Sequence, residues 1–235
     1  TFNPDGTYSF DPGPDFQDLQ PLETREVTFT YTATDEDGGV SEPATVTITV
    51  TGINDALVLN DTTDPDAVVE QLNASAQDLT AIAGLFTVED ADIGDTLTPA
   101  VVGAPTVELN GVAFSLPAGA VALIDNSAFN LTGTTSNGGT AEITYSYDPG
   151  AVDLDFLADG DALTLTYDVN VTDGTNTSTP QNVTITINGT NDIPLVSGDS
   201  QSTDEDNILT SSVPAATDVD GTIATDGYTL VDDVT

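Results

Sequence analysis

Residues 163–171 read LTLTYDVNV, with apolar side chains at every second position and polar side chains between them. The same alternation runs through residues 27–31 (VTFTY) and 45–51 (TVTITVT). A period of two is typical of a β-strand with one buried face, and branched Thr suits the exposed face of a sheet. Only residues 67–84 carry apolar spacing that suggests a helix. The sequence therefore predicts an all-β fold of two antiparallel sheets packed face to face.

The chain repeats itself with an offset of 137 residues. Three matches occur in the same order: YSFDPG at 8–13 with YSYDPG at 145–150, VTITV at 46–50 with VTITI at 183–187, and GIND at 52–55 with GTND at 189–192. Ordered matches at one spacing indicate an internal structural repeat.

This repeat divides the chain into three parts. We expect residues 1–55 to be the C-terminal half of one repeat, residues 56–192 a complete repeat, and residues 193–235 the N-terminal half of the next. The chain opens within a motif, so we expect it to be part of a larger protein. The two halves read as neighbouring pieces of one repeat. This predicts that residues 193–235 of one copy complete residues 1–55 of the next, head to tail. The copies would form either a fibre of separate chains, joined by strand addition, or a covalent tandem array.

The composition is strongly acidic and excludes several function classes. The chain has 40 Asp and Glu, a single Lys or Arg, no His and no Cys, which gives a formal net charge of −39. Repulsion among these carboxylates opposes folding unless cations from solution neutralise it. A disordered chain is the alternative, but 38% of the residues are hydrophobic and follow a regular pattern, which favours a folded domain. Phosphate backbones require Lys and Arg, so nucleic acid is excluded as a partner. Without His, Cys or Lys as base or nucleophile, we expect no enzyme, and no apolar run is long enough to span a membrane.

Acidic residues gather in loops and at the Asn-Asp junctions of the repeats. In a two-sheet sandwich, the loop after the second strand and the loop before the last strand share the pole where the chain enters. We therefore expect these clusters to meet at one end of each repeat. The candidate ligands are Asp35, Asp37, Asn54, Asp55, Glu89, Asp90, Asp92, Asp95, Asp173, Asn191, Asp192, Glu205, Asp218 and Asp220.

Oxygen ligands on flexible loops favour Ca²⁺, which takes about 6–8 of them at about 2.3–2.6 Å. Mg²⁺ demands a stricter octahedron, and Zn²⁺ prefers His or Cys, which the chain lacks. The alternative is that Asp-x-Asp-Gly stretches are only polar turns. Because the acidic pattern recurs at equivalent places beside both junctions, the sequence predicts several bound Ca²⁺ ions.

Residues 31–56 (YTATDEDGGVSEPATVTITVTGINDA) resemble the end of the VCBS and cadherin-like repeats of large secreted, RTX-type bacterial adhesins. Residues 5–12 (DGTYSFDP) look like the middle motif of the same family, and residues 204–206 and 218–221 look like its beginning. The resemblance covers both half-repeats, whereas residues 57–140 match it only loosely. Ala56-Leu57 departs from the Ala-Pro that usually follows the family's junction.

The resemblance implies tandem immunoglobulin-like or cadherin-like β-sandwich repeats joined by calcium-binding linkers. It implies an extracellular extender module at the bacterial cell surface or in a matrix fibre, whose partners are neighbouring repeats, with any glycan or surface target bound by other parts of the parent protein. The alternative is a calcium-dependent carbohydrate-binding module, with residues 100–140 as the place for a ligand. Such sites usually offer an aromatic platform, but the chain has no Trp and its Tyr and Phe follow the strand alternation, which favours core positions.

Overall fold

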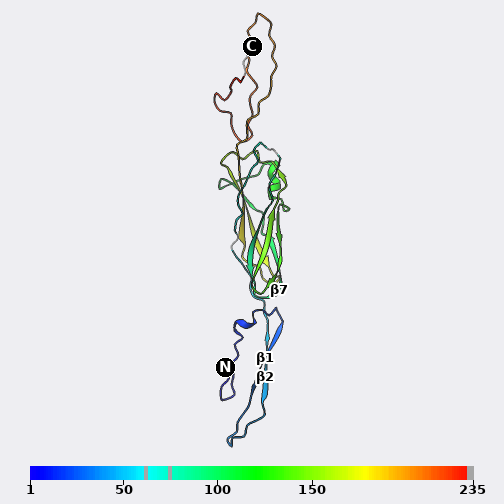
Figure 1. The fold of residues 1–235 in the computed structure, drawn as a ribbon, viewed down its shortest axis with the longest axis vertical. Coiled ribbons are helices and arrows are strands. Elements are labelled where there is room, and N and C mark those ends of the chain that lie inside the picture. The colour runs from blue at the N-terminus through cyan, green and yellow to red at the C-terminus, as the bar shows by residue number, and fades with distance from the viewer. Residues whose placement is uncertain (61–62, 74–75, 232–235) are drawn as a thin grey trace.

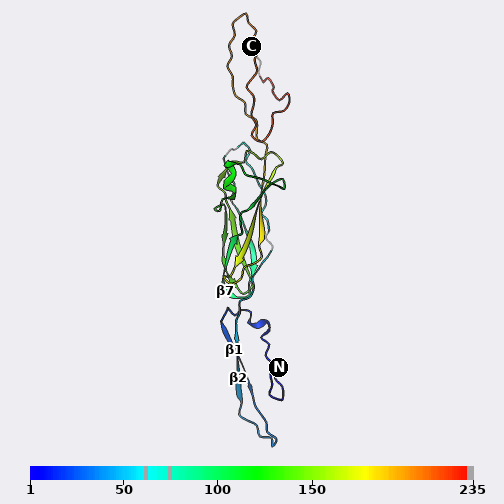
Figure 2. The same ribbon diagram turned by 180° about the vertical axis from the view of Figure 1, so that it is seen from behind.

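The computed structural model describes residues 1–60, 63–73 and 76–231, and the molecule is elongated, with three successive sections (Figure 1). We call residues 1–55 the N-terminal section, residues 56–192 the central repeat and residues 193–231 the C-terminal section. The central repeat is a β-sandwich, and the other two sections lie at its opposite ends, as the view from behind also shows (Figure 2). The predicted all-β fold is confirmed. Within the described residues, no helix is both long and apolar enough to cross a membrane.

Two sheets form the central repeat. The four-stranded sheet has the order β10 (Phe129–Thr132), β12 (Thr140–Tyr147), β6 (Ile82–Glu89) and β3 (Val58–Leu59). The seven-stranded sheet contains β11 (Thr134–Asn137), β7 (Ile93–Val101), β14 (Ala162–Thr172), β15 (Gln181–Asn188) and β4 (Val68–Val69), with β8 (Thr106–Leu109) on β14 and β9 (Val112–Ala113) on β8. The pairings are antiparallel except that of β15 with β4. A small sheet pairs β13 (Ala151–Val152) with β5 (Gln77–Asp78).

The core lies between the two sheets. The alternate residues of β14 that the sequence singled out are all buried, as are the inner residues of β15 and β12. The rings of Phe129 and Tyr167 stack across the sandwich at 4.4 Å. The hydroxyls of Tyr147 and Tyr167 both donate to the carbonyl of Leu123, in the 3-10 helix η2 (Ala118–Ile124), at 3.0 Å. These bonds satisfy the polar tips of two buried rings, as burial of Tyr requires.

The suggested helix over residues 67–84 is wrong where the structure describes it; residues 74 and 75 lie outside the described part. Strands β4 and β5 and the start of β6 occupy this stretch instead. Hydrogen bonding to β15, β13 and β12 overrides the weak helical spacing, because each of those strands offers the segment a partner.

The N-terminal section has the local structure of the end of the central repeat. After the short 3-10 helix η1 (Gly13–Phe16), β1 (Thr24–Tyr31) pairs with β2 (Ala44–Thr51) as β14 pairs with β15. Gly52 N–H donates to the backbone carbonyl of Glu23 at 2.8 Å, and Gly189 N–H donates to the backbone carbonyl of Asp161 at 2.9 Å. A Cβ on Gly52 or Gly189 would lie 2.3 or 2.4 Å from a backbone oxygen. Close approach of the chain therefore explains why both copies carry glycine here.

The C-terminal section has the local contacts of the start of the central repeat. Leu195 bridges Thr217, as Val58 pairs with Glu89 between β3 and β6. By this correspondence, Asp192 is the counterpart of Asp55, and residues 210–217 are the counterpart of β6. Apart from this isolated bridge, the described residues of the C-terminal section form no regular strand.

Candidate cation sites at the two junctions

The first junction is fastened to two loops of the central repeat. The backbone N–H of Asp55 donates to Asp92 Oδ2 at 2.7 Å, in the turn between β6 and β7. The Asn54 side-chain amide donates to Asp173 Oδ2 at 3.1 Å, in the loop after β14. The loops from the two sheets and the linker therefore meet at one pole, which is the topology that the sequence analysis expected.

The carboxylates at this pole have a spacing that suits one ion. One oxygen each of Asp90, Asp95 and Asp173 lies within 4.8 Å of the others. Two oxygens on opposite sides of a Ca²⁺ ion, each about 2.4 Å from it, are about 4.8 Å apart. Asp90 is 3% exposed and Asp92 is fully buried, yet Asp90 Oδ2 and Asp92 Oδ1 have no hydrogen-bond partner in the described part of the chain. A buried unpaired carboxylate oxygen costs several kcal/mol, which a bound cation would offset.

The second junction gathers carboxylates from three segments. Oxygens of Glu70, Asp155 and Asp192 lie within 4.8 Å of one another. Glu70 accepts a hydrogen bond from the backbone N–H of Thr190 at 3.1 Å. Asp192 is 2% exposed, and its Oδ2 and Asp155 Oδ1 have no partner among the residues described. This junction therefore has the same combination of converging carboxylates and unsatisfied buried oxygens.

Hydrogen bonds also tie the second linker to its neighbours on both sides. The backbone N–H of Asp192 donates to Asp220 Oδ2 at 3.1 Å, as Asp55 does to Asp92 at the first junction. Asn73, in the left-handed conformation with φ 55°, donates its N–H to Asp192 Oδ1 and accepts from the N–H of Ile193 at 2.7 Å. A cavity of about 140 Å³ lies beside Asp155 and Asp192 and extends to Val219 of the C-terminal section.

No basic side chain neutralises either cluster. Arg25 is the one Lys or Arg in the sequence. It forms an exposed ion pair with Asp18 at 2.8 Å and lies over the Phe16 ring at 5.6 Å. Any compensating positive charge at the junctions must therefore come from solution.

Burial and mutual repulsion raise the pKa values of several clustered carboxyls. Desolvation is the largest cause for Asp90, Asp92 and Asp95, and neighbouring carboxylates add to it. Desolvation raises the pKa of Glu70 to about 7, with Asp192 adding to the rise. Desolvation also opposes ionisation of Asp173, but hydrogen bonds from Asn176, Thr175 and Asn54 outweigh it and lower its pKa.

These shifts predict an unusual pH dependence for the metal-free chain. A carboxyl whose pKa is higher in the folded state binds protons more tightly there than in the unfolded state, so stability falls as pH rises between the two values. For Glu70 this window runs from 4.5 to about 7. We expect the thermal unfolding midpoint of the metal-free chain to fall by several degrees between pH 5 and pH 7.5. With Ca²⁺ bound, protons compete with the ion and the slope should reverse. A metal-free midpoint that rises over this range would contradict the prediction.

Not every predicted ligand joins a cluster. Asp35 accepts from the N–H groups of Asp37 and Gly39 within its own turn, at the end of the β1–β2 hairpin away from the first junction, and Asp37 is exposed (Figure 1). The Glu89 side chain is exposed, because side chains alternate along β6 and that of Glu89 points away from the buried Asp90. It accepts a hydrogen bond from the Asn60 side-chain amide at 3.5 Å. Glu205 is exposed and has no hydrogen bond to the second cluster in the described part. The other predicted ligands lie at the junctions: Asn54, Asp55, Asp90, Asp92, Asp95, Asp173, Asn191, Asp192, Asp218 and Asp220.

Four further residues lie at the junctions and were not predicted from the sequence. Glu70 and Asp155 complete the second cluster, and Asn73 binds its linker. Gln20 donates to Asp95 Oδ1 at 3.0 Å and to the Ile93 carbonyl at 2.6 Å, which joins the N-terminal section to the central repeat. A signal existed for Glu70, which is the first glutamate after the Asp55 junction, as Glu205 is after Asp192.

Comparisons with known proteins identify no family. No protein-family model matches the chain, and no curated protein sequence matches it. Among solved structures, the chain is similar to the ASH/PapD-like domain of human CEP192 (PapD-like domain 7), at 9% identity and a TM-score of 0.27, over 58% of this chain and 84% of that one. A likeness at this level carries no functional argument, so the sandwich assignment rests on the strand pairing above.

Proposed function

We propose that the chain is a non-catalytic spacer segment of an extracellular, calcium-dependent bacterial adhesin or matrix fibre. In this proposal Ca²⁺ at the junctions holds successive β-sandwich repeats in line. The observation that carries it is the convergence, at each linker, of carboxylates from separate segments. At each linker the group includes buried oxygens that have no hydrogen-bond partner among the described residues. A rigid spacer needs such a bond between repeats, because a peptide linker alone bends freely.

The donor set suits a hard cation. The donors are carboxylate oxygens on loops, which Ca²⁺ accepts in flexible geometry. Asp90, Asp95 and Asp173 would hold an ion at the first junction, together with the unpartnered Oδ1 of the neighbouring Asp92. Glu70, Asp155 and Asp192 would hold one at the second. Each ion would replace repulsion among these groups by attraction, and separating the repeats would then break metal–oxygen bonds.

The extracellular setting follows from the affinity expected for such sites. Extracellular calcium modules bind at about 10⁻⁴–10⁻³ M, so calcium outside a cell fills them and cytosolic calcium does not. In the central repeat the carbohydrate-binding alternative has less support, because Tyr145, Tyr147 and Tyr167 are all buried in its core and offer no platform for a sugar.

Solution X-ray scattering of the whole chain tests the spacer proposal. In millimolar Ca²⁺ we expect a longer maximum dimension and the profile of a stiff rod, and in chelator the profile of sections joined by hinges. Asp92→Asn should weaken this response. Asp168→Asn is the matched control, because Asp168 is exposed on β14, away from both clusters. Superimposable profiles with and without Ca²⁺ would overturn the proposal.

A further inference from the structure

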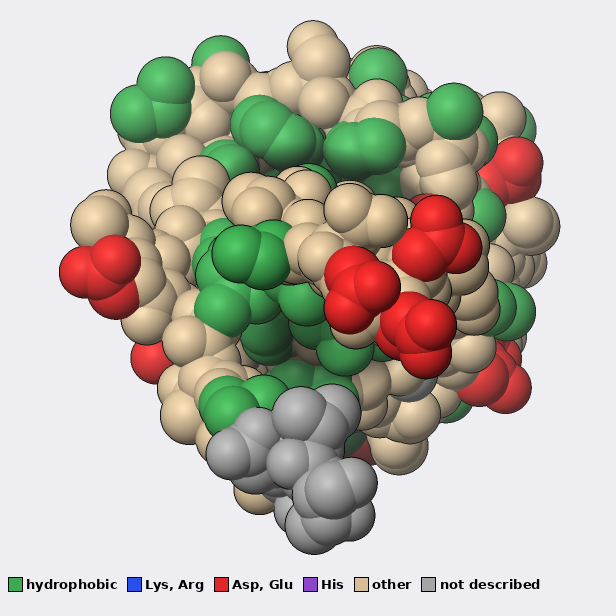
Figure 3. Space-filling view, turned by 90° about the horizontal axis from the view of Figure 1, so that it is seen from above, with side chains coloured by type: hydrophobic (Ala, Val, Ile, Leu, Met, Phe, Trp, Pro, Cys, Tyr) green, Lys and Arg blue, Asp and Glu red, His purple; other side chains and the backbone are tan. Residues whose placement is uncertain are grey.

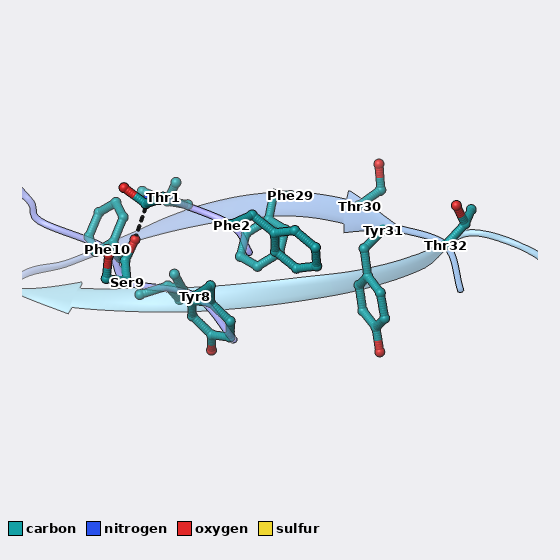
Figure 4. A pocket seen from close by; sticks show the side chains of 11 residues that line it. Thr1, Phe2, Tyr8, Ser9, Phe10, Phe29, Thr30, Tyr31 and Thr32 are labelled. Carbon is teal, nitrogen blue, oxygen red and sulfur yellow. Dashed lines mark hydrogen bonds between the residues drawn. The ribbon is translucent and has the colours of Figure 1, made fainter. Parts of the chain in front are cut away.

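The N-terminal section has an apolar face that no other part of the described chain covers. Val27 and Phe29 of β1 and Ile48 of β2 line a groove of about 650 Å³, together with Phe2 and Tyr8. Figure 4 shows Phe2 and Tyr8 lying against Phe29, with ring centroids 5.8 and 5.1 Å from it. These rings fill only part of the face, since Phe2, Tyr8 and Tyr31 remain more than a third exposed.

The central repeat shows what normally covers this face. Pairing registers match Phe29 with Tyr167 and Ile48 with Ile185, because Phe29 lies opposite Val46 as Tyr167 lies opposite Val183. Tyr167 and Ile185 are buried against the four-stranded sheet that contains β3 and β6. The groove therefore lacks the counterpart of β3 and β6.

The C-terminal section carries that counterpart without a partner of its own. The Leu195–Thr217 bridge aligns Val196 with Leu59 of β3, and Ala216 with Val88 of β6. Leu59 is 3% exposed in the core of the central repeat, whereas Val196 is 75% exposed. Seen from above, the C-terminal end of the molecule presents hydrophobic side chains between acidic ones (Figure 3).

The segment and the groove of one molecule cannot meet. The two sections lie at opposite ends of the elongated molecule, with the central repeat between them (Figures 1 and 2). Within the described residues, only a second copy of the chain can therefore bring the segment to the groove. The composite unit would lack counterparts of β8–β11 and η2. The strands β10 and β11 are the outer strands of their sheets, so both sheets would still form without them. Phe129 of β10 and Leu123 of η2 belong to the core, so the composite core would be smaller than that of the central repeat.

We propose that residues 193–231 of one copy bind the β1–β2 face of a second copy and complete a β-sandwich with it. Residues 2–10 of the second copy would take the place of β12, since Tyr8 and Phe10 match Tyr145 and Tyr147. The interface is heterologous, so each bound copy still offers a free groove or a free segment, and assembly continues as a linear chain. This proposal stands on the uncovered faces and does not depend on calcium.

Charge gives the assembly a recognisable salt dependence. Each copy carries a formal charge of −39, so approaching copies repel. Salt screens this repulsion and leaves the apolar contact intact. Association should therefore strengthen with NaCl, whereas association through ion pairs would weaken.

Complementary variants of the whole chain test the proposal. Phe29→Asp puts a charge in the groove and leaves the C-terminal section intact. Val196→Asp puts a charge in the C-terminal section and leaves the groove intact. Analytical ultracentrifugation should show concentration-dependent chains for the unchanged protein and at least about tenfold weaker association for each variant alone. An equimolar mixture of the two variants should restore one interface and stop at 1:1 heterodimers. Thr28→Asp, on the exposed face of β1, and Val213→Asp, which matches the exposed Leu85 of β6, are controls that should associate normally.

The outcomes are distinct. Heterodimers from variants that do not associate singly support the proposal, because local unfolding in either variant could not create them. A monomeric protein at every concentration up to high salt overturns it, as does association that Phe29→Asp leaves unchanged. The same measurements in chelator keep this result separate from the calcium proposal, because loss of calcium binding with heterodimer formation retained would overturn only the latter.

Discussion

Millimolar Ca²⁺ is expected to raise the thermal unfolding midpoint of the central repeat by about 10–20 °C over the metal-free protein. An ion present at about 100 times its dissociation constant stabilises the folded state by about 2.7 kcal/mol per site, so two sites give about 5 kcal/mol. For a domain of this size, 1 kcal/mol shifts the midpoint by roughly 2–4 °C or somewhat more. Circular dichroism melts in chelator and in 10 mM Ca²⁺ would measure the shift.

Asp92→Asn separates bound calcium from a general salt effect. In the metal-free protein this change removes a buried charge whose Oδ1 has no hydrogen-bond partner among the described residues, and it should raise the midpoint. In Ca²⁺ it should reduce the gain. Asp168→Asn is the control and should leave the calcium response unchanged. An equal rise on adding NaCl of the same ionic strength would contradict specific binding.

The same substitution at two equivalent positions is expected to have very different effects on the free energy of unfolding. Ile185→Ala should destabilise the central repeat by about 2–5 kcal/mol, because Ile185 is fully buried and its removal leaves a cavity. Ile48→Ala changes the same residue in the matching strand of the N-terminal section, where the side chain is only half-buried. It should cost less than about 1 kcal/mol in dilute, monomeric protein. Urea unfolding at low concentration would measure both values.

The comparison tests whether the central repeat holds the stable core. Equal costs for Ile48→Ala and Ile185→Ala would mean that the N-terminal face is covered even in the monomer. That result would contradict the uncovered groove on which the assembly proposal rests.

The long strands could be predicted from the sequence because their burial is one-sided. Strands β1, β2, β14 and β15 carry strict alternation, and the structure pairs them as two hairpins. Strands β3, β4, β5 and β13 are two residues long and depend on partners far along the chain. No local period marks such strands, which is why residues 67–84 were mistaken for a weak helix.

Some junction residues also have a signal in the sequence, and others have none. Asn54, Asp55, Asp92 and Asp173 stood out because their pattern recurs in the second copy. Asp155 had no such signal. In the structure Gly52 lies against Leu19 as Gly189 lies against Leu157, and this alignment places Gln17 at the position of Asp155. The 3-10 turn before Leu157 brings Asp155 to the second linker, and only the three-dimensional arrangement shows this.

The direct test of calcium at the junctions is isothermal titration calorimetry of the whole, metal-free chain with Ca²⁺. The account predicts at least two ions bound per chain at sub-millimolar to millimolar dissociation constants, with binding at the first junction weakened by Asp92→Asn and unaffected by Asp168→Asn. Titration to 10 mM Ca²⁺ with no saturable binding would contradict it.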